Sequence, residues 1–196
     1  MVNKIIQKMG RTMEKIIDSK NIKFRKLTAT IICIVFWTAG SIVTVGFFNM
    51  SKQSVAIEVL LIIQLLAALW DINNMIIPFK ITVPAIFAGV GIMAITGRVL
   101  EGMTATIVSF LLMKLLAIIS RNQVGGGDIA IMTVTGLYTG ISTLICILFT
   151  SVTVTGLFSA IFIISGKAHK KTEIPFAPFI LAATVMLILI GYVQYI

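Results

Sequence analysis

Hydrophobic residues fill most of this chain in long runs, and polar residues gather in short segments between them. A helix that crosses a bilayer needs roughly 20 apolar residues, and several of the runs have about this length. The longest, 129–166, contains no Asp, Glu, Lys, Arg or His. It is too long for one helix, so we expect a break near the turn-like sequence TGIST at 139–143. The predicted segments are 27–49, 54–70, 81–97, a fourth from the turn at 98–102 to about 120, 129–139, 144–165 and 175–196.

This pattern predicts an all-α fold: a polytopic membrane helical bundle of about seven helical segments. The composition agrees, since 58% of the 196 residues are hydrophobic and only 12% are charged, against about a quarter charged in soluble domains. We expect two parts, a basic cytoplasmic tail at 1–26 and a membrane-embedded domain at 27–196. Such a domain leaves no room for a sizeable soluble module.

The basic residues predict the orientation of the bundle. Eight of the sixteen Lys and Arg residues fall in the tail, whose apolar positions recur at helical spacing. An amphipathic helix on the membrane surface and a solvated tail are both compatible with this pattern. With the N-terminus inside, thirteen Lys and Arg residues lie on the inner side, and only Lys52 and Arg98 lie on the outer side. Cytoplasmic loops carry the excess of positive charge, so segments 71–80 and 125–128 are predicted to face the cytoplasm from the cell membrane.

The sequence argues against several other classes of protein. The net charge of +9 is concentrated in the tail, and no basic patch alternates with stacking aromatic residues as nucleic-acid binding requires. Cys33 and Cys146 lie inside apolar runs and form no CxxC pair that could hold zinc. The N-terminal region does not have the features of a cleavable signal peptide. We therefore expect the lipid bilayer as a partner, no nucleic acid, no metal and no cofactor.

Two of the seven acidic residues differ from the rest. Asp71 and Asp128 each stand where a span meets an inner loop, with apolar or glycine neighbours. Singly, Asp128 could be a helix N-cap, and Asp71 could mark the membrane interface. The other five are explained by a solvated surface: Glu14, Asp18, Glu58, Glu101 and Glu173.

As a pair, Asp71 and Asp128 indicate a chemistry. Two carboxylates in a low-dielectric site do not both ionise easily and tend to share one proton. One can then act as general base on a water while the other donates to a carbonyl. This is the chemistry of aspartic proteolysis.

Gly125, Gly126 and Gly127 directly precede Asp128 and fit the same interpretation. Glycine permits an unusual backbone path and close approach of another chain. An extended peptide could therefore pair with this segment. A flexible turn is the alternative, and it explains one glycine better than three. The predicted helix 129–139 is about 16 Å long at 1.5 Å per residue, short of a full bilayer core.

These residues lie in three motifs that resemble the type IV prepilin peptidases, the GxGD class of membrane aspartic proteases. The first is WDINNMIIPFKIT, which contains Asp71, Ile77 and Pro78. The second is GGGDIAIMTVTGLYTG, which matches Gly-x-Gly-Asp at Gly125, Gly127 and Asp128. The third is IPFAPFILA at 174–182, and the resemblance covers about 54–196. Phe79 and Ala130 depart from the residues that the family often has at those places.

The resemblance implies that Asp71 and Asp128 are the catalytic pair of a prepilin leader peptidase. It also implies the substrate, a prepilin or pilin-like precursor whose short basic leader precedes an apolar helix. We assign substrate binding to Gly125, Gly126, Gly127 and Pro78. The paired CxxC region that carries N-methyltransferase activity in many members is not seen, so we expect the short form, which cleaves without methylating.

Two alternatives use the same residues. The chain could be a small transporter in which the two aspartates relay protons or bind a cation, since intramembrane acids often mark ion paths. It could also be an inactive relative that acts in pilus assembly. Transporters often contain internal repeats, and none is evident here, which favours the peptidase.

Overall fold

A computed structural model describes residues 26–46, 52–120, 124–165 and 174–191, and all the regular elements in these ranges are helices. The predicted all-α bundle is therefore confirmed. Five helices are long and apolar enough to cross a membrane, and we treat the chain as a multi-pass membrane protein. The number of crossings and the inside N-terminus stay predictions, and the tail at 1–25 lies outside the described residues. The helices are Lys26–Gly46, α2 (Lys52–Asn74), α3 (Phe79–Thr96), α4 (Val99–Ile119), α5 (Gly126–Ile164) and α6 (Ala177–Leu189).

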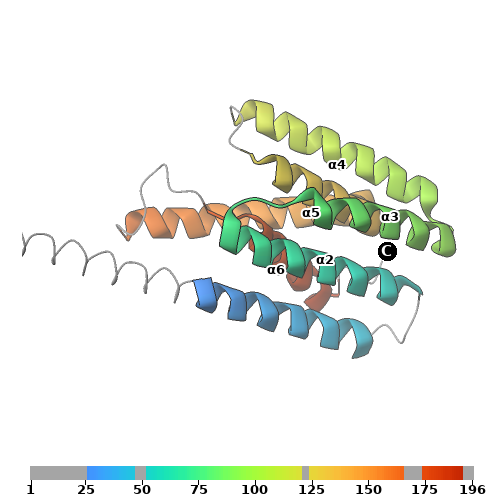
Figure 1. Cartoon of the computed structure of the whole chain (residues 1–196), viewed down its shortest axis with the longest axis horizontal. Coiled ribbons are helices and arrows are strands. Elements are labelled where there is room, and N and C mark those ends of the chain that lie inside the picture. The colour runs from blue at the N-terminus through green and yellow to red at the C-terminus, as the bar shows by residue number, and fades with distance from the viewer. Residues whose placement is uncertain (1–25, 47–51, 121–123, 166–173, 192–196) are drawn as a thin grey trace, which may run out of the picture.

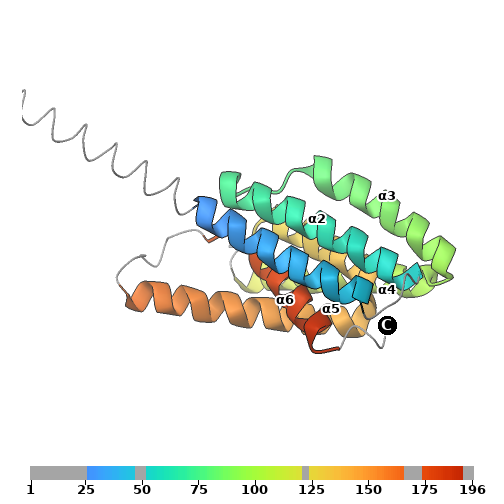
Figure 2. The ribbon, with the colours of Figure 1, turned by 90° about the horizontal axis from the view of Figure 1, so that it is seen from below.

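Figures 1 and 2 show how these helices are arranged. The N-terminal helix and α4 lie on opposite sides of the bundle in Figure 1, with α2, α5 and α6 between them. Helix α4 packs along α5, and α6 contacts both α2 and α5. The core therefore lies among α2, α5 and α6, while much of α3 and α4 presents large exposed hydrophobic side chains, as expected for surfaces that face lipid.

The buried residues of α2 form one stripe along the helix. They recur at spacings of three and four residues, the repeat that places side chains on one face. Gln64 and Asp71 are the large polar members of this stripe, and both are buried. The residues of the stripe are Ser54, Ala56, Ile57, Leu60, Leu61, Ile63, Gln64, Ala67, Ala68, Asp71 and Ile72.

Helix α5 is divided at Gly140, inside the TGIST region where the sequence predicts a break. The backbone there has φ 74° and ψ 175°, which is not helical. The part at 126–139 and the part at 141–164 run in opposite directions in Figure 1, so the chain turns back at Gly140. Phe158, in the second part, makes a ring contact with Phe179 near the start of α6. The first part is about 21 Å long at 1.5 Å per residue, which is shorter than the hydrocarbon core.

Close packing of small residues holds the first part of α5 against α4. A Cβ on Gly136 would lie 2.9 Å from the Ala105 carbonyl oxygen and 3.1 Å from Ser109 Cβ. Ser109 Oγ donates to the Met132 carbonyl oxygen at 2.8 Å. Small residues at such contacts let helix backbones approach closely in membranes. On the other side, Tyr138 OH donates to the Ala85 carbonyl oxygen at 2.8 Å and so joins α5 to α3.

We expect Gly140→Ala to destabilise the bundle. Its backbone lies in a region that is essentially restricted to glycine, and a Cβ would lie 2.6 Å from Glu101 Oε1. The free energy of unfolding should fall by about 2 kcal/mol or more. The measurement is the unfolding midpoint in mixed micelles, followed by circular dichroism. Gly91→Ala is the control, because a Cβ there meets nothing within 4 Å; equal midpoints for the two variants would contradict this assignment.

Candidate active site

Three helix ends meet at the same end of the bundle and carry the candidate site. Asp71 lies in the last turn of α2, Asp128 in the first turn of α5, and α6 begins at Ala177. The prediction that Asp71 follows its span is wrong, because α2 continues to Asn74. The side chains of Asn73 and Asn74 bond to carbonyl oxygens four residues earlier in the same helix, Leu69 at 2.8 Å and Trp70 at 3.2 Å.

The start of α5 also differs from the prediction. The helix begins at Gly126, before the expected residue 129, and Gly125 with φ −66° and ψ 147° is its N-cap. The interpretation of Asp128 as the N-cap is therefore wrong. Asp128 lies in the first turn, where its own N–H bonds to the Gly125 carbonyl oxygen at 3.1 Å. Its carboxylate accepts a hydrogen bond from the backbone N–H of Gly125, the contact that an acidic residue three positions after the N-cap makes in a capping box.

Asp71 and Asp128 line one cavity of about 180 Å³. Asp71 is 5% exposed and Asp128 is half-buried. They are close enough for the charge of one to act on the other. A water needs about 10–15 Å³ of such space, so several waters fit beside the two carboxylates. The lining residues are Asp71, Met75, Ile76, Ile77, Gly125, Gly126, Gly127 and Asp128.

Besides burial, helix ends and backbone amides act on the charges of the two carboxylates. A carboxylate is favoured at a helix N-terminus and disfavoured at a C-terminus. Asp128 has the favourable position at the start of α5, and Asp71 has the unfavourable one at the end of α2. The Ala177 N–H at the start of α6 compensates by donating to Asp71 Oδ2 at 3.1 Å in a buried bond. The motif IPFAPF thus supplies a donor to the first aspartate.

The glycines before Asp128 have different surroundings. A Cβ on Gly127 would lie 2.8 Å from Ile77 Cβ and 3.1 Å from the Ile77 backbone nitrogen. A Cβ on Gly126 would meet nothing within 4 Å, and Gly125 and Gly126 are exposed at the cavity. Gly127 is therefore required by packing against the loop before α3, while the first two glycines leave the cavity edge open.

Pro78 is not among the residues that line the cavity. It is the N-cap of α3, with φ −75° and ψ 145°. Its neighbours Met75, Ile76 and Ile77 line the cavity, and sequence reasoning did not single out the first two. The feature of the sequence that could have identified them is their position in the short segment between Asp71 and the next predicted helix.

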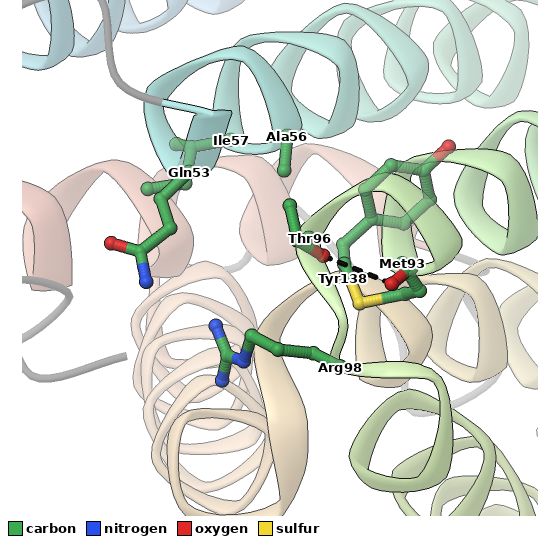
Figure 3. A pocket seen from close by; sticks show the side chains of 7 residues that line it. All are labelled: Gln53, Ala56, Ile57, Met93, Thr96, Arg98 and Tyr138. Atoms are coloured by element: carbon green, nitrogen blue, oxygen red, sulfur yellow. Dashed lines mark hydrogen bonds between the residues drawn. The ribbon is translucent and has the colours of Figure 1, made fainter.

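A second cavity lies near the α3–α4 turn, at the other end of the bundle (Figure 3). Its volume is about 10 Å³, space for about one water. Arg98 reaches it and pairs with Glu101 at 2.7 Å. Among the described residues, no three His, Cys, Asp or Glu side chains gather as metal ligands. The cavity that Asp71 and Asp128 line is much larger than this second cavity, and so it is the better candidate for binding substrate.

Comparison with known proteins identifies the family. The sequence model of the type IV leader peptidase family matches residues 58–161, just over half of the chain, and this range includes both aspartates. The chain belongs to the type IV leader peptidase family. The resemblance that the three motifs suggested is confirmed.

A curated relative gives a second match to this peptidase family. The chain is 28% identical over 146 residues to the "Prepilin leader peptidase/N-methyltransferase" of Bacillus subtilis (strain 168). The match covers 74% of this chain and 59% of that protein, so the chain spans less than two thirds of the relative's length. No solved structure matches the chain.

Proposed function

We propose that the chain is a membrane aspartic endopeptidase that removes the basic leader from prepilin or pilin-like precursors at the cytoplasmic face. One observation carries the proposal: two carboxylates 57 positions apart in the sequence, Asp71 and Asp128, line the same cavity. Membership of the type IV leader peptidase family supports the peptidase activity and the class of substrate.

The reaction that this geometry supports uses one water held between the carboxylates. The ionised aspartate takes a proton from the water, whose oxygen attacks the scissile carbonyl carbon. The protonated aspartate donates a hydrogen bond to the carbonyl oxygen, where negative charge develops. Collapse of the tetrahedral intermediate breaks the C–N bond, and the leaving nitrogen takes a proton from the pair. A single shared proton suffices for each turnover.

Substrate is proposed to lie along the open edge formed by Gly125 and Gly126. The first amides of an α-helix have no carbonyl partner within that helix. The N–H groups at the start of α5 can therefore donate to an extended peptide beside Asp128. The apolar side chains of Met75 and Ile76, both exposed, border the other side of the cavity. An extended segment between a basic leader and an apolar helix fits such an edge.

The test is cleavage of a prepilin by the purified protein in phospholipid vesicles, followed by mass spectrometry of the released leader. We expect one cut between the leader and the apolar helix, unaffected by a metal chelator. Absence of cleavage for every pilin precursor tested would contradict the proposal. A proton or cation flux that depends on both aspartates, without cleavage, would favour the transporter.

A further inference from the structure

A buried polar pair joins α2 to α5 two helical turns away from the aspartates. Gln64 Nε2 donates to Thr135 Oγ1 at 3.1 Å, and the two side chains are 1% and 0% exposed. Gln64 precedes Asp71 by seven residues, and Thr135 follows Asp128 by seven. Seven residues are about two turns, or roughly 10 Å, and return to nearly the same helix face.

The equal spacing links the two pairs. Helix α2 runs toward the site and the first part of α5 runs away from it (Figure 1). In such an antiparallel contact, the register that pairs Gln64 with Thr135 is also the register that brings Asp71 level with Asp128. A shift of one helix by one turn, about 5 Å, would separate both pairs at once.

The surroundings of the polar pair make this register specific. Its neighbours in both helices are buried apolar side chains, such as Leu60, Leu61 and Met132. An amide and a hydroxyl without partners in such surroundings are costly. Thr135 Oγ1 already donates to the Ile131 carbonyl oxygen at 3.0 Å, and so it is oriented to accept from Gln64. Buried polar contacts of this kind fix helix register in coiled coils.

We propose that Gln64 and Thr135 are positioning residues, which hold α2 and α5 in the register that places the two aspartates across one water. This inference rests on the proposed function. Neither residue lines the cavity of the aspartates, so they act through the helices and not on the substrate.

The first test measures catalysis in the vesicle assay. Gln64→Leu and Thr135→Val should each lower kcat about 30-fold and leave KM within about threefold, since a displacement of 1 Å can cost about 100-fold. Thr135→Ser retains the hydroxyl and should restore kcat to within about threefold of wild type. The double variant should be no slower than the slower single variant, because both changes break one contact.

Thr139→Val is the matched control. Thr139 is a buried threonine one turn further along α5, and its hydroxyl donates to the Thr135 carbonyl oxygen within its own helix at 2.9 Å. We expect this variant to keep kcat within about threefold. If it loses as much as Thr135→Val, or if the two single losses multiply in the double variant, the positioning role is wrong.

The second test measures register without activity. Asp71→Cys and Asp128→Cys are combined in a chain that also carries Cys33→Ala and Cys146→Ala, and the rate of cross-linking by a short thiol reagent is recorded in membranes. Adding Gln64→Leu should slow cross-linking at least threefold, while Thr139→Val should not. Unchanged cross-linking with Gln64→Leu overturns the inference. If wild type cleaves no prepilin, the proposed function fails, and this measurement still decides the register.

Discussion

Asp71→Asn and Asp128→Asn should each lower kcat for prepilin cleavage at least about 10²-fold, because general acid–base catalysis by a positioned side chain contributes about 10²–10⁴-fold. Asparagine keeps the size of the side chain and one acceptor oxygen, but it neither takes nor gives a proton in the reaction. At Asp71 the amide can still accept from the Ala177 N–H, so the variant should fold normally. The measurement is single-turnover cleavage in vesicles, with membrane insertion and elution from gel filtration as checks.

Glu58→Gln is the control for the aspartate variants. Glu58 is another carboxylate of α2 and is half-buried, but it lies near the opposite end of the helix, where it accepts from Ser41 Oγ at 3.0 Å. Its amide variant should cleave within about threefold of wild type, as expected for a structural contact. The double aspartate variant should be no slower than either single variant, because residues that act as a unit are not additive. Activity retained by either single variant would show that the pair is not catalytic.

Gly127→Ala should lower kcat about 100-fold although it removes no chemical group. The added Cβ would lie 2.8 Å from Ile77 Cβ and 3.1 Å from the Ile77 backbone nitrogen, so either the loop before α3 or the start of α5 must shift. Asp128 is the next residue, and a displacement of about 1 Å can cost about 100-fold. The loss should appear in kcat more than in KM, measured with the same precursor.

Gly126→Ala separates packing within the protein from contact with substrate. A Cβ there meets nothing of the protein within 4 Å, so the effect on kcat should be at least about tenfold smaller than at Gly127. A rise in KM for this variant would indicate that substrate lies along the open edge formed by Gly125 and Gly126. Equal losses of kcat at the two positions would contradict the packing argument.

Much of the fold could be predicted because the bilayer imposes a simple rule on the sequence. Apolar runs of about 20 residues read directly as helices, and the observed α2, α3 and α4 differ from the predicted spans by a few residues at their ends. The break in the long apolar stretch was predictable because glycine with turn-forming neighbours adopts positive φ readily. The turn before α4 occurs at Gly97 and Arg98, earlier than predicted, since Gly97 with φ 74° ends α3.

Features that depend on tertiary contacts could not be predicted. The extension of α5 to Gly126 contradicts the low helix propensity of glycine, and it places Gly127 close to Ile77. The bond from Ala177 to Asp71 joins residues 106 positions apart. Nothing in the local sequence distinguishes the Ala177 amide from other helix N-termini. Gln64 is a single polar residue in an apolar helix, and its partner Thr135 is visible only once α2 and α5 are paired.

The central claim is that Asp71 and Asp128 act together on one water, and it is tested most directly with a peptide analogue of the tetrahedral intermediate. The peptide carries a leader sequence and a secondary alcohol in place of the scissile amide, and its matched control lacks only the hydroxyl. Binding is measured by displacement of a fluorescent leader peptide from the protein in vesicles. Analogues of the transition state bind at least about 10²-fold tighter than ground-state ligands. We predict that the alcohol binds wild type at least about 100-fold more tightly than the control, and that either asparagine variant loses this advantage. An advantage that survives in Asp71→Asn or in Asp128→Asn would contradict the claim.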